Sequence, residues 1–276
     1  LYGRAPLMVS KQCVRKTYGK CDKKNKETLL KQNTDREYIV KSVCSFCYTV
    51  TRAGAFDLSK EDGADSVERD GDHEDSIYYA HPDFYNMKST DSLTILSNFK
   101  TLQQSSEWSC GVDSALMVLN YYDKLGSYTE ESLANFRTNK LEAEATSLRS
   151  MINIFEGVGG MKIHSTYDYS EEEASEKINL DMIRQYLEKG IPVMVAWNDW
   201  GGHWQTIIGY DDLGTETTQD DVIIVADSYD TTDHNQDGYG IIPAERFYYN
   251  WTMYDFFEKN YNIDERDHLF IAVEPE

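Results

Sequence analysis

Residues 103–122 of the chain read Gln-Gln-Ser-Ser-Glu-Trp-Ser-Cys-Gly-Val-Asp-Ser-Ala-Leu-Met-Val-Leu-Asn-Tyr-Tyr. The apolar residues that follow Cys110 recur at the spacing of one helix face, namely Val112, Ala115, Leu116 and Leu119. Cys110 is therefore expected at or near the N-terminus of a helix. The positive end of a helix dipole stabilises a thiolate and lowers its pKa. Gln104, six residues upstream, could donate a hydrogen bond to an oxyanion that forms beside the sulfur.

Cys110 also admits a plainer interpretation, because a lone cysteine is most often a buried structural residue. It is the only cysteine after residue 47, so no second thiol suggests a disulfide or a metal site beside it. The choice between a structural and a nucleophilic cysteine depends on whether the rest of the chain supplies a base.

Composition sets limits on the class of protein. A chain of 276 residues that is 40% hydrophobic can build one large domain or two small ones. No apolar run approaches the length of a membrane span, and nothing resembles a signal peptide. We therefore expect no membrane partner. The lone thiol and the single CxxC sequence indicate a reducing compartment, and the predicted location is the cytoplasm.

Charge divides the chain into two parts. Residues 1–53 hold 12 Lys and Arg against 4 Asp and Glu, whereas the remainder holds 15 against 44. The acidic remainder argues against nucleic acid as its partner, because phosphates would be repelled. The basic head has two interpretations: it docks on RNA or another acidic surface, or it is simply a solvated basic surface.

The head also carries four cysteines: Cys13, Cys21, Cys44 and Cys47. Their spacing is compatible with an iron–sulfur or zinc site, and equally with four unrelated thiols. The segments YGRAPLMVSKQCVRKT, CDKK, DREYIV and CSFCY resemble a fragment of the collagenase-like peptidase family, family U thirty-two. Some members of that family bind an iron–sulfur cluster through cysteines, which implies such a role for these four residues.

We predict three segments along the chain. Residues 1–53 form the cysteine-rich head, residues 54–90 an acidic linker with little apolar content, and residues 91–276 one domain. In that domain, helices are predicted from a cap at Thr129 through Phe136, after a cap at Thr146, and over about 179–189. Strands are predicted over 192–197, 203–210, 222–227 and 269–273. Helices followed by strands favour an α+β fold with a mostly antiparallel sheet.

Two further residues supply the chemistry that Cys110 requires. His203 opens a predicted strand directly after two glycines, and Asp227 ends the next strand. A carboxylate beside a histidine on the neighbouring strand can hold the imidazole and fix its tautomer. Each residue alone has a structural interpretation, a strand histidine and a turn-initiating aspartate.

Taken together, the order Gln104, Cys110, His203, Asp227 resembles that of the papain-like cysteine peptidases. With the sequence GGHWQTIIGYDD, residues 93–273 are most similar to the double-glycine-leader peptidases, cysteine peptidase family thirty-nine. The resemblance implies a papain-like fold with a Cys-His-Asp triad and a glutamine oxyanion donor. It implies hydrolysis of peptide, isopeptide or amide bonds in a peptide or protein substrate, without a cofactor.

Other functions remain open at this point. The same architecture serves peptidyl transfer in phytochelatin synthases, and it could also persist as a non-catalytic binding module, with the head as its metal or RNA-docking piece. The sequence does not predict an oligomeric state. Asp233, Asn235 and Asp237, followed by Gly238, copy the start of a calcium loop, but position twelve is alanine, and an Asp-Gly turn explains the same residues.

Overall fold

The structure is a computed structural model that describes residues 82–199, 202–230, 236–251 and 267–276. The predicted head and residues 54–81 of the predicted linker lie outside the described residues. The iron–sulfur or zinc site predicted at Cys13, Cys21, Cys44 and Cys47 therefore stays a prediction, and so does RNA docking by the head. The domain boundaries and the family U thirty-two resemblance also stay predictions.

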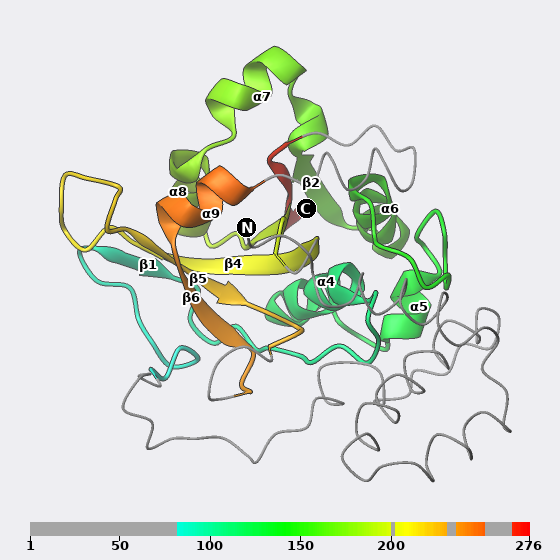
Figure 1. Cartoon of the computed structure of the whole chain (residues 1–276). Helices are drawn as coiled ribbons and strands as arrows, with labels where there is room; N and C mark the ends of the chain where they lie inside the picture. Colours follow the sequence, from blue (N-terminus) through cyan, green and yellow to red (C-terminus); the bar gives the residue numbers. More distant parts are fainter. Residues whose placement is uncertain (1–81, 200–201, 231–235, 252–266) are drawn as a thin grey trace, which may run out of the picture.

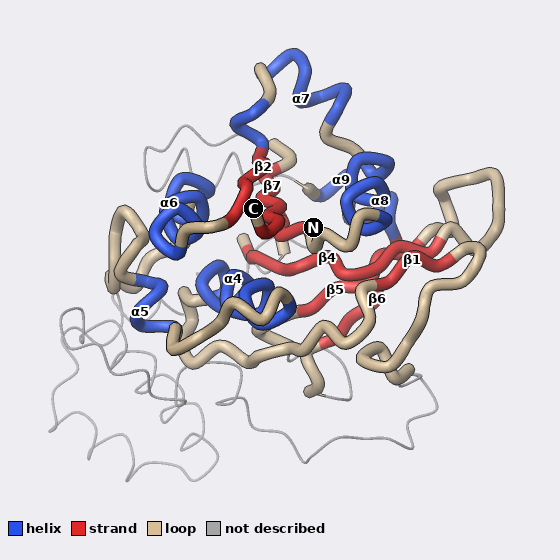
Figure 2. The backbone as a smooth tube through the Cα atoms, turned by 180° about the vertical axis from the view of Figure 1, so that it is seen from behind, coloured by secondary structure: helices blue, strands red, loops and turns tan. Residues whose placement is uncertain are grey.

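One antiparallel sheet organises the described part of the chain (Figures 1 and 2). Its strands follow the order β2-β7-β3-β4-β5-β6, and β1 pairs with the C-terminal end of β4, from Gly209 to Asp211. In chain order the strands are β1 (Leu93–Ile95), β2 (Met161–Ser165), β3 (Val193–Trp197), β4 (His203–Asp211), β5 (Val222–Ala226), β6 (Tyr239–Pro243) and β7 (Leu269–Pro275). Strand β3 and β4 up to Tyr210 are buried, which explains the continuous apolar sequence of β3; β4 buries polar side chains as well, among them His203 and Gln205.

Helices cover the sheet from two sides. The helices are α4 (Cys110–Tyr121), α5 (Glu130–Ala134), α6 (Leu148–Val158), α7 (Glu171–Lys177), α8 (Leu180–Glu188) and α9 (Ala244–Asn250), with a 3-10 turn, η3, at Thr166–Asp168. Helices α4 and α8 both contact β4, and the two views place them on different sides of it (Figures 1 and 2). The predicted α+β architecture is confirmed, with the helix that carries Cys110 packed on a sheet that carries His203.

Several predicted elements need correction. The cap of α6 is Ser147 and not Thr146: the Ser147 hydroxyl accepts a hydrogen bond from the Ser150 N–H at 3.2 Å. Thr129 does cap α5, through a reciprocal pair of bonds with Ser132, but that helix ends at Ala134. The elements β2, β6, α7 and α9 were not predicted, because their sequences are mixed in polarity and carry little periodicity.

The core extends beyond the elements of the sheet. Phe84 lies in the segment predicted as linker, yet it is buried and its ring packs on Tyr239 at 5.6 Å. Within the described ranges, the structure contains no helix that is both long and apolar enough to cross a membrane.

Candidate active site

Cys110 is the first residue of α4. Its N–H has no acceptor inside the helix because the first backbone donors of any helix lack one. The cap residue, Ser109, makes no side-chain capping bond, so the first turn keeps free donors beside the sulfur. The Cys110 thiol is buried and hydrogen-bonds the His203 side chain and the backbone N–H groups of Trp204 and Gly111.

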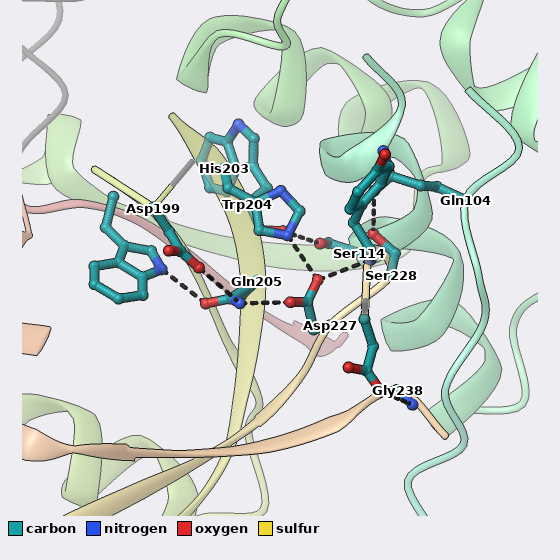
Figure 3. Close-up of polar contacts among 12 residues, drawn as sticks. Gln104, Ser114, Asp199, His203, Trp204, Gln205, Asp227, Ser228 and Gly238 are labelled. Carbon is teal, nitrogen blue, oxygen red and sulfur yellow. Dashed lines mark hydrogen bonds and ion pairs between the residues drawn. The ribbon is translucent and has the colours of Figure 1, made fainter. Parts of the chain in front are cut away.

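His203 connects the cysteine to Asp227. Its Nε2 lies 2.6 Å from Asp227 Oδ1, which leaves the other ring nitrogen, Nδ1, for the thiol (Figure 3). Strand pairing brings His203 and Asp227 together. Thr206 on β4 pairs with Ala226 on β5, and because the two strands are antiparallel, Asp227 follows at the level of Gln205, two residues from His203. All three side chains of the Cys-His-Asp series are buried.

Burial and charge act in opposite directions at these groups. Burial alone would raise the pKa of the Cys110 thiol, but the hydrogen bond and charge of His203, with the two N–H donors, bring that pKa below its usual value. Burial alone would lower the pKa of His203, but the charge and hydrogen bond of Asp227 raise it well above its usual range. The arrangement therefore favours a thiolate–imidazolium pair.

Gln104 lies on the loop that leads into Cys110, and it is almost completely buried. Its Nε2 donates to the Ser106 carbonyl at 2.7 Å, and its Oε1 accepts from the Ser228 hydroxyl at 2.7 Å. An amide nitrogen has two N–H bonds, so one remains for another acceptor. The neighbouring Gln103 instead lies beside Gly238, where its Nε2 would be 3.0 Å from an added Cβ.

Glu130 holds the same loop from α5. Its carboxylate accepts from the Ser105 N–H at 3.3 Å and from the Ser105 hydroxyl at 2.9 Å. Trp108 is buried in the core, and the guanidinium of Arg137 lies 4.4 Å from its ring centroid. Glu130 thus holds the first half of the loop between Gln104 and Cys110, and the buried Trp108 holds the second half.

A second buried carboxyl group lies close to Cys110. Asp113 is in the first turn of α4, and burial raises its pKa well above the usual value; the charge of the nearby Glu130 adds to that shift. The Cys110 charge also acts on the guanidinium of Arg137, whose pKa burial lowers to about 10. Near Cys110 there are therefore a carboxyl group that resists ionisation and a guanidinium that keeps its charge at neutral pH.

The sequence analysis missed several residues of the site, among them Gln205, Trp197, Ser228 and Glu130. Gln205 Nε2 donates to Asp227 Oδ2 at 2.7 Å (Figure 3). Trp197 Nε1 in turn donates to Gln205 Oε1 at 2.7 Å. Only one signal in the sequence pointed to Gln205. It lies two residues after His203 on a strand, so both side chains share a face.

The calcium site stays a prediction. Asp233 and Asn235 lie outside the described residues, whereas Asp237 Oδ1 accepts the Tyr239 N–H at 2.9 Å, as in an Asp-Gly turn. Among the residues that the structure describes, no group of three or more His, Cys, Asp or Glu side chains could hold a metal ion.

Comparison with protein families adds an independent observation. The model of the Peptidase_C39 like family matches residues 96–257, more than half of the chain, and this range contains Gln104, Cys110, His203 and Asp227. The chain belongs to the Peptidase_C39 like family. No curated protein matches it. Membership supports a cysteine peptidase in general terms and agrees with the resemblance seen in the sequence; the match does not reach the head.

Proposed function

We propose that the protein is a cysteine peptidase that cleaves peptide, isopeptide or related amide bonds through Cys110, His203 and Asp227. The observation that carries the proposal is the continuous series of hydrogen bonds from the Cys110 thiol to His203 and from His203 Nε2 to Asp227 Oδ1. A structural cysteine would not need a buried, charged partner, because burial penalises the charge.

The chemistry follows from the residue types. His203 holds the proton of the thiol, and the Cys110 sulfur attacks the carbonyl carbon of the scissile bond. The carbonyl oxygen gains the negative charge, next to the N–H of Cys110 and the remaining N–H of Gln104. The C–N bond breaks when His203 returns its proton to the leaving amine, which gives a thioester. Water, deprotonated by His203, then releases the acid and regenerates the thiol.

Asp227 supports the imidazolium that exists before and during these steps. Its Oδ1 fixes the Nε2 side of the ring, so the Nδ1 side stays directed at the sulfur. The burial of all three groups excludes water, and each charge interaction is therefore stronger than it would be in solvent.

The test is digestion of a peptide library by the full chain, with product identification by mass spectrometry. Cleavage by the wild type that is lost in both Cys110→Ala and His203→Ala supports the proposal. A wild type that cuts nothing, with a Cys110 that alkylates at pH 6 no faster than free cysteine, contradicts it and favours a binding module of the same fold. Products joined to an added amine instead of water would indicate peptidyl transfer.

A further inference from the structure

Asp227 uses its two carboxylate oxygens differently. Oδ1 accepts from His203 Nε2 at 2.6 Å and from the Tyr229 N–H at 2.8 Å. Oδ2 accepts from Gln205 Nε2 at 2.7 Å (Figure 3). Hydrogen bonds to both oxygens therefore fix the orientation of the carboxylate, and His203 supplies the bond to only one of the two oxygens.

The amide of Gln205 is itself held in one orientation. The indole N–H of Trp197 can only donate, and it lies 2.7 Å from Gln205 Oε1. The oxygen of the amide must therefore face Trp197, and the NH2 group must face Asp227. Trp197 is in turn fixed by Phe247, whose ring packs on it edge to face at a centroid distance of 5.3 Å.

The strands explain why these groups meet. On β3 and β4, Trp197 pairs with His203 and Val195 pairs with Gln205, so Trp197, His203 and Gln205 lie on one face of the sheet. Trp197, Gln205 and Asp227 are each at most 6% exposed, so water does not substitute for a lost donor at Asp227.

We propose that Gln205, oriented by Trp197, is a positioning residue that keeps Asp227 ionised and turned toward His203. This inference rests on the proposed function, because it assigns a role in activating the Cys110 thiol. Gln205 touches neither the sulfur nor a substrate. Its NH2 group donates to Asp227 Oδ2 and, at 3.5 Å, to Asp199 Oδ2, and its effect on the thiol passes through Asp227.

The physical argument concerns the charge on Asp227. Burial raises the pKa of Asp227, and the charge and hydrogen bond of His203, with the bonds from Tyr229 and Gln205, lower it below the usual value. Without Gln205, Oδ2 is a buried acceptor with no donor, so the carboxyl takes up a proton at a higher pH. A protonated Asp227 no longer stabilises the imidazolium, and the Cys110 thiolate is lost with it.

The experiment follows alkylation of Cys110 in the full chain by iodoacetamide between pH 4 and pH 9. Modification is read on the peptide that contains Cys110 by mass spectrometry, because the head carries four other thiols. In Gln205→Met we expect the acid limb of the rate profile to move up by about one pH unit. The rate at pH 5 then falls about tenfold, while the rate at pH 8 changes by less than about twofold.

The control variant is Thr206→Val. Thr206 is the next residue of β4 and points to the other face; it is fully buried, and no described residue hydrogen-bonds its hydroxyl. Thr206→Val should keep the wild-type acid limb. A merely structural role for Gln205 would lower the rate equally at every pH, together with the melting temperature.

Two further variants make the test independent of whether Gln205→Met folds. Gln205→Leu removes the same donor to Asp227 Oδ2 with a side chain of different shape, and the acid limb should move up by about as much as in Gln205→Met. Trp197→Phe keeps the ring but removes the donor to Gln205, and it should move the limb in the same direction by a smaller amount.

Folded Gln205→Leu and Trp197→Phe variants with the wild-type acid limb would overturn the inference and leave the proposed function intact. A wild-type Cys110 that reacts at pH 6 like free cysteine would instead overturn the proposed function, and the inference with it. The two failures are therefore distinguishable in one set of measurements.

Discussion

The Ser228 hydroxyl donates to Gln104 Oε1 at 2.7 Å, although 124 positions separate the two residues in the chain. A second bond joins the same pair, from the Gln104 N–H to the Ser228 carbonyl at 2.8 Å. Ser228 directly follows Asp227, so the end of β5 fixes the support of the histidine and also the loop that leads into α4. The residue pair Gln104–Ser228 thus links the loop before Cys110 to the strand end that carries Asp227.

Ser228→Ala tests this coupling. Loss of the hydroxyl leaves Gln104 Oε1 without its side-chain donor, and the amide can turn away from the oxyanion. We expect turnover of a cleaved library peptide to fall about fivefold, because a neutral hydrogen bond contributes roughly 1 kcal/mol. Alkylation of Cys110 at pH 6 should be unchanged. Equal losses in turnover and alkylation would show that Ser228 acts on the thiol instead, and Ser175→Ala on exposed α7 is the matched control.

Gln104→Ala should reduce turnover by about a hundredfold, because an oxyanion donor acts mainly on the transition state. Its effect on the alkylation rate of Cys110 should be small. Gln103→Ala is the matched control, since Gln103 lies beside Gly238 and away from the Ser106 and Ser228 bonds. If Gln103→Ala is the damaging variant and Gln104→Ala is not, the assigned oxyanion donor is wrong by one residue.

His203→Ala should raise the pKa of the Cys110 thiol. Burial raises this pKa, and the variant lacks the hydrogen bond and charge of His203 that lower it. The wild type should alkylate rapidly at pH 6, where free cysteine is almost entirely a thiol. The variant should be slower by at least about a hundredfold at pH 6 and recover part of the rate near pH 9. The alkylation rate as a function of pH measures the difference, and superimposable profiles would exclude an ion pair.

Asp113 makes stability depend on pH. Its folded pKa lies well above its unfolded value near 3.8, so the folded state binds the extra proton. The resulting stabilisation is complete below the unfolded pKa and is lost as pH rises through the folded pKa. Asp113→Asn removes this dependence: urea unfolding should find the variant more stable than the wild type at pH 8, with a smaller difference at pH 5. The exposed Asp181→Asn should not reproduce that change.

The corrected cap of α6 gives a direct stability test. Ser147→Ala removes the acceptor for the Ser150 N–H, and the free energy of unfolding should fall by about 1 kcal/mol. Thr146→Val should be nearly neutral by comparison, because the Thr146 hydroxyl is buried and has no hydrogen-bond partner among the described residues. A larger loss in Thr146→Val, measured by thermal unfolding, would restore Thr146 as the cap.

Local patterns in the sequence were enough to predict the elements that bear the site. The apolar face after Cys110 predicted α4, and the buried runs around His203 and before Asp227 predicted β4 and β5. The boundary at Thr146 was wrong because threonine and serine are both good caps, and only the backbone geometry of Ser147 distinguishes them.

The supporting residues could not be predicted in the same way. Glu130 reaches Ser105 across 25 positions and Ser228 reaches Gln104 across 124, and no local periodicity encodes such distances. The role of Trp197 depends on strand pairing: its partner is His203, and this register exists only once β3 and β4 have met. Tertiary contacts, and not intrinsic preferences, decide these positions.

The order of the sheet also bears on how the protein is made. Strand β7 hydrogen-bonds β2 on one side and β3 on the other, although it is the last of the described strands along the chain. During synthesis, β2 and β3 therefore have no shared partner until residues 269–275 emerge from the ribosome. Such late, long-range pairing slows folding.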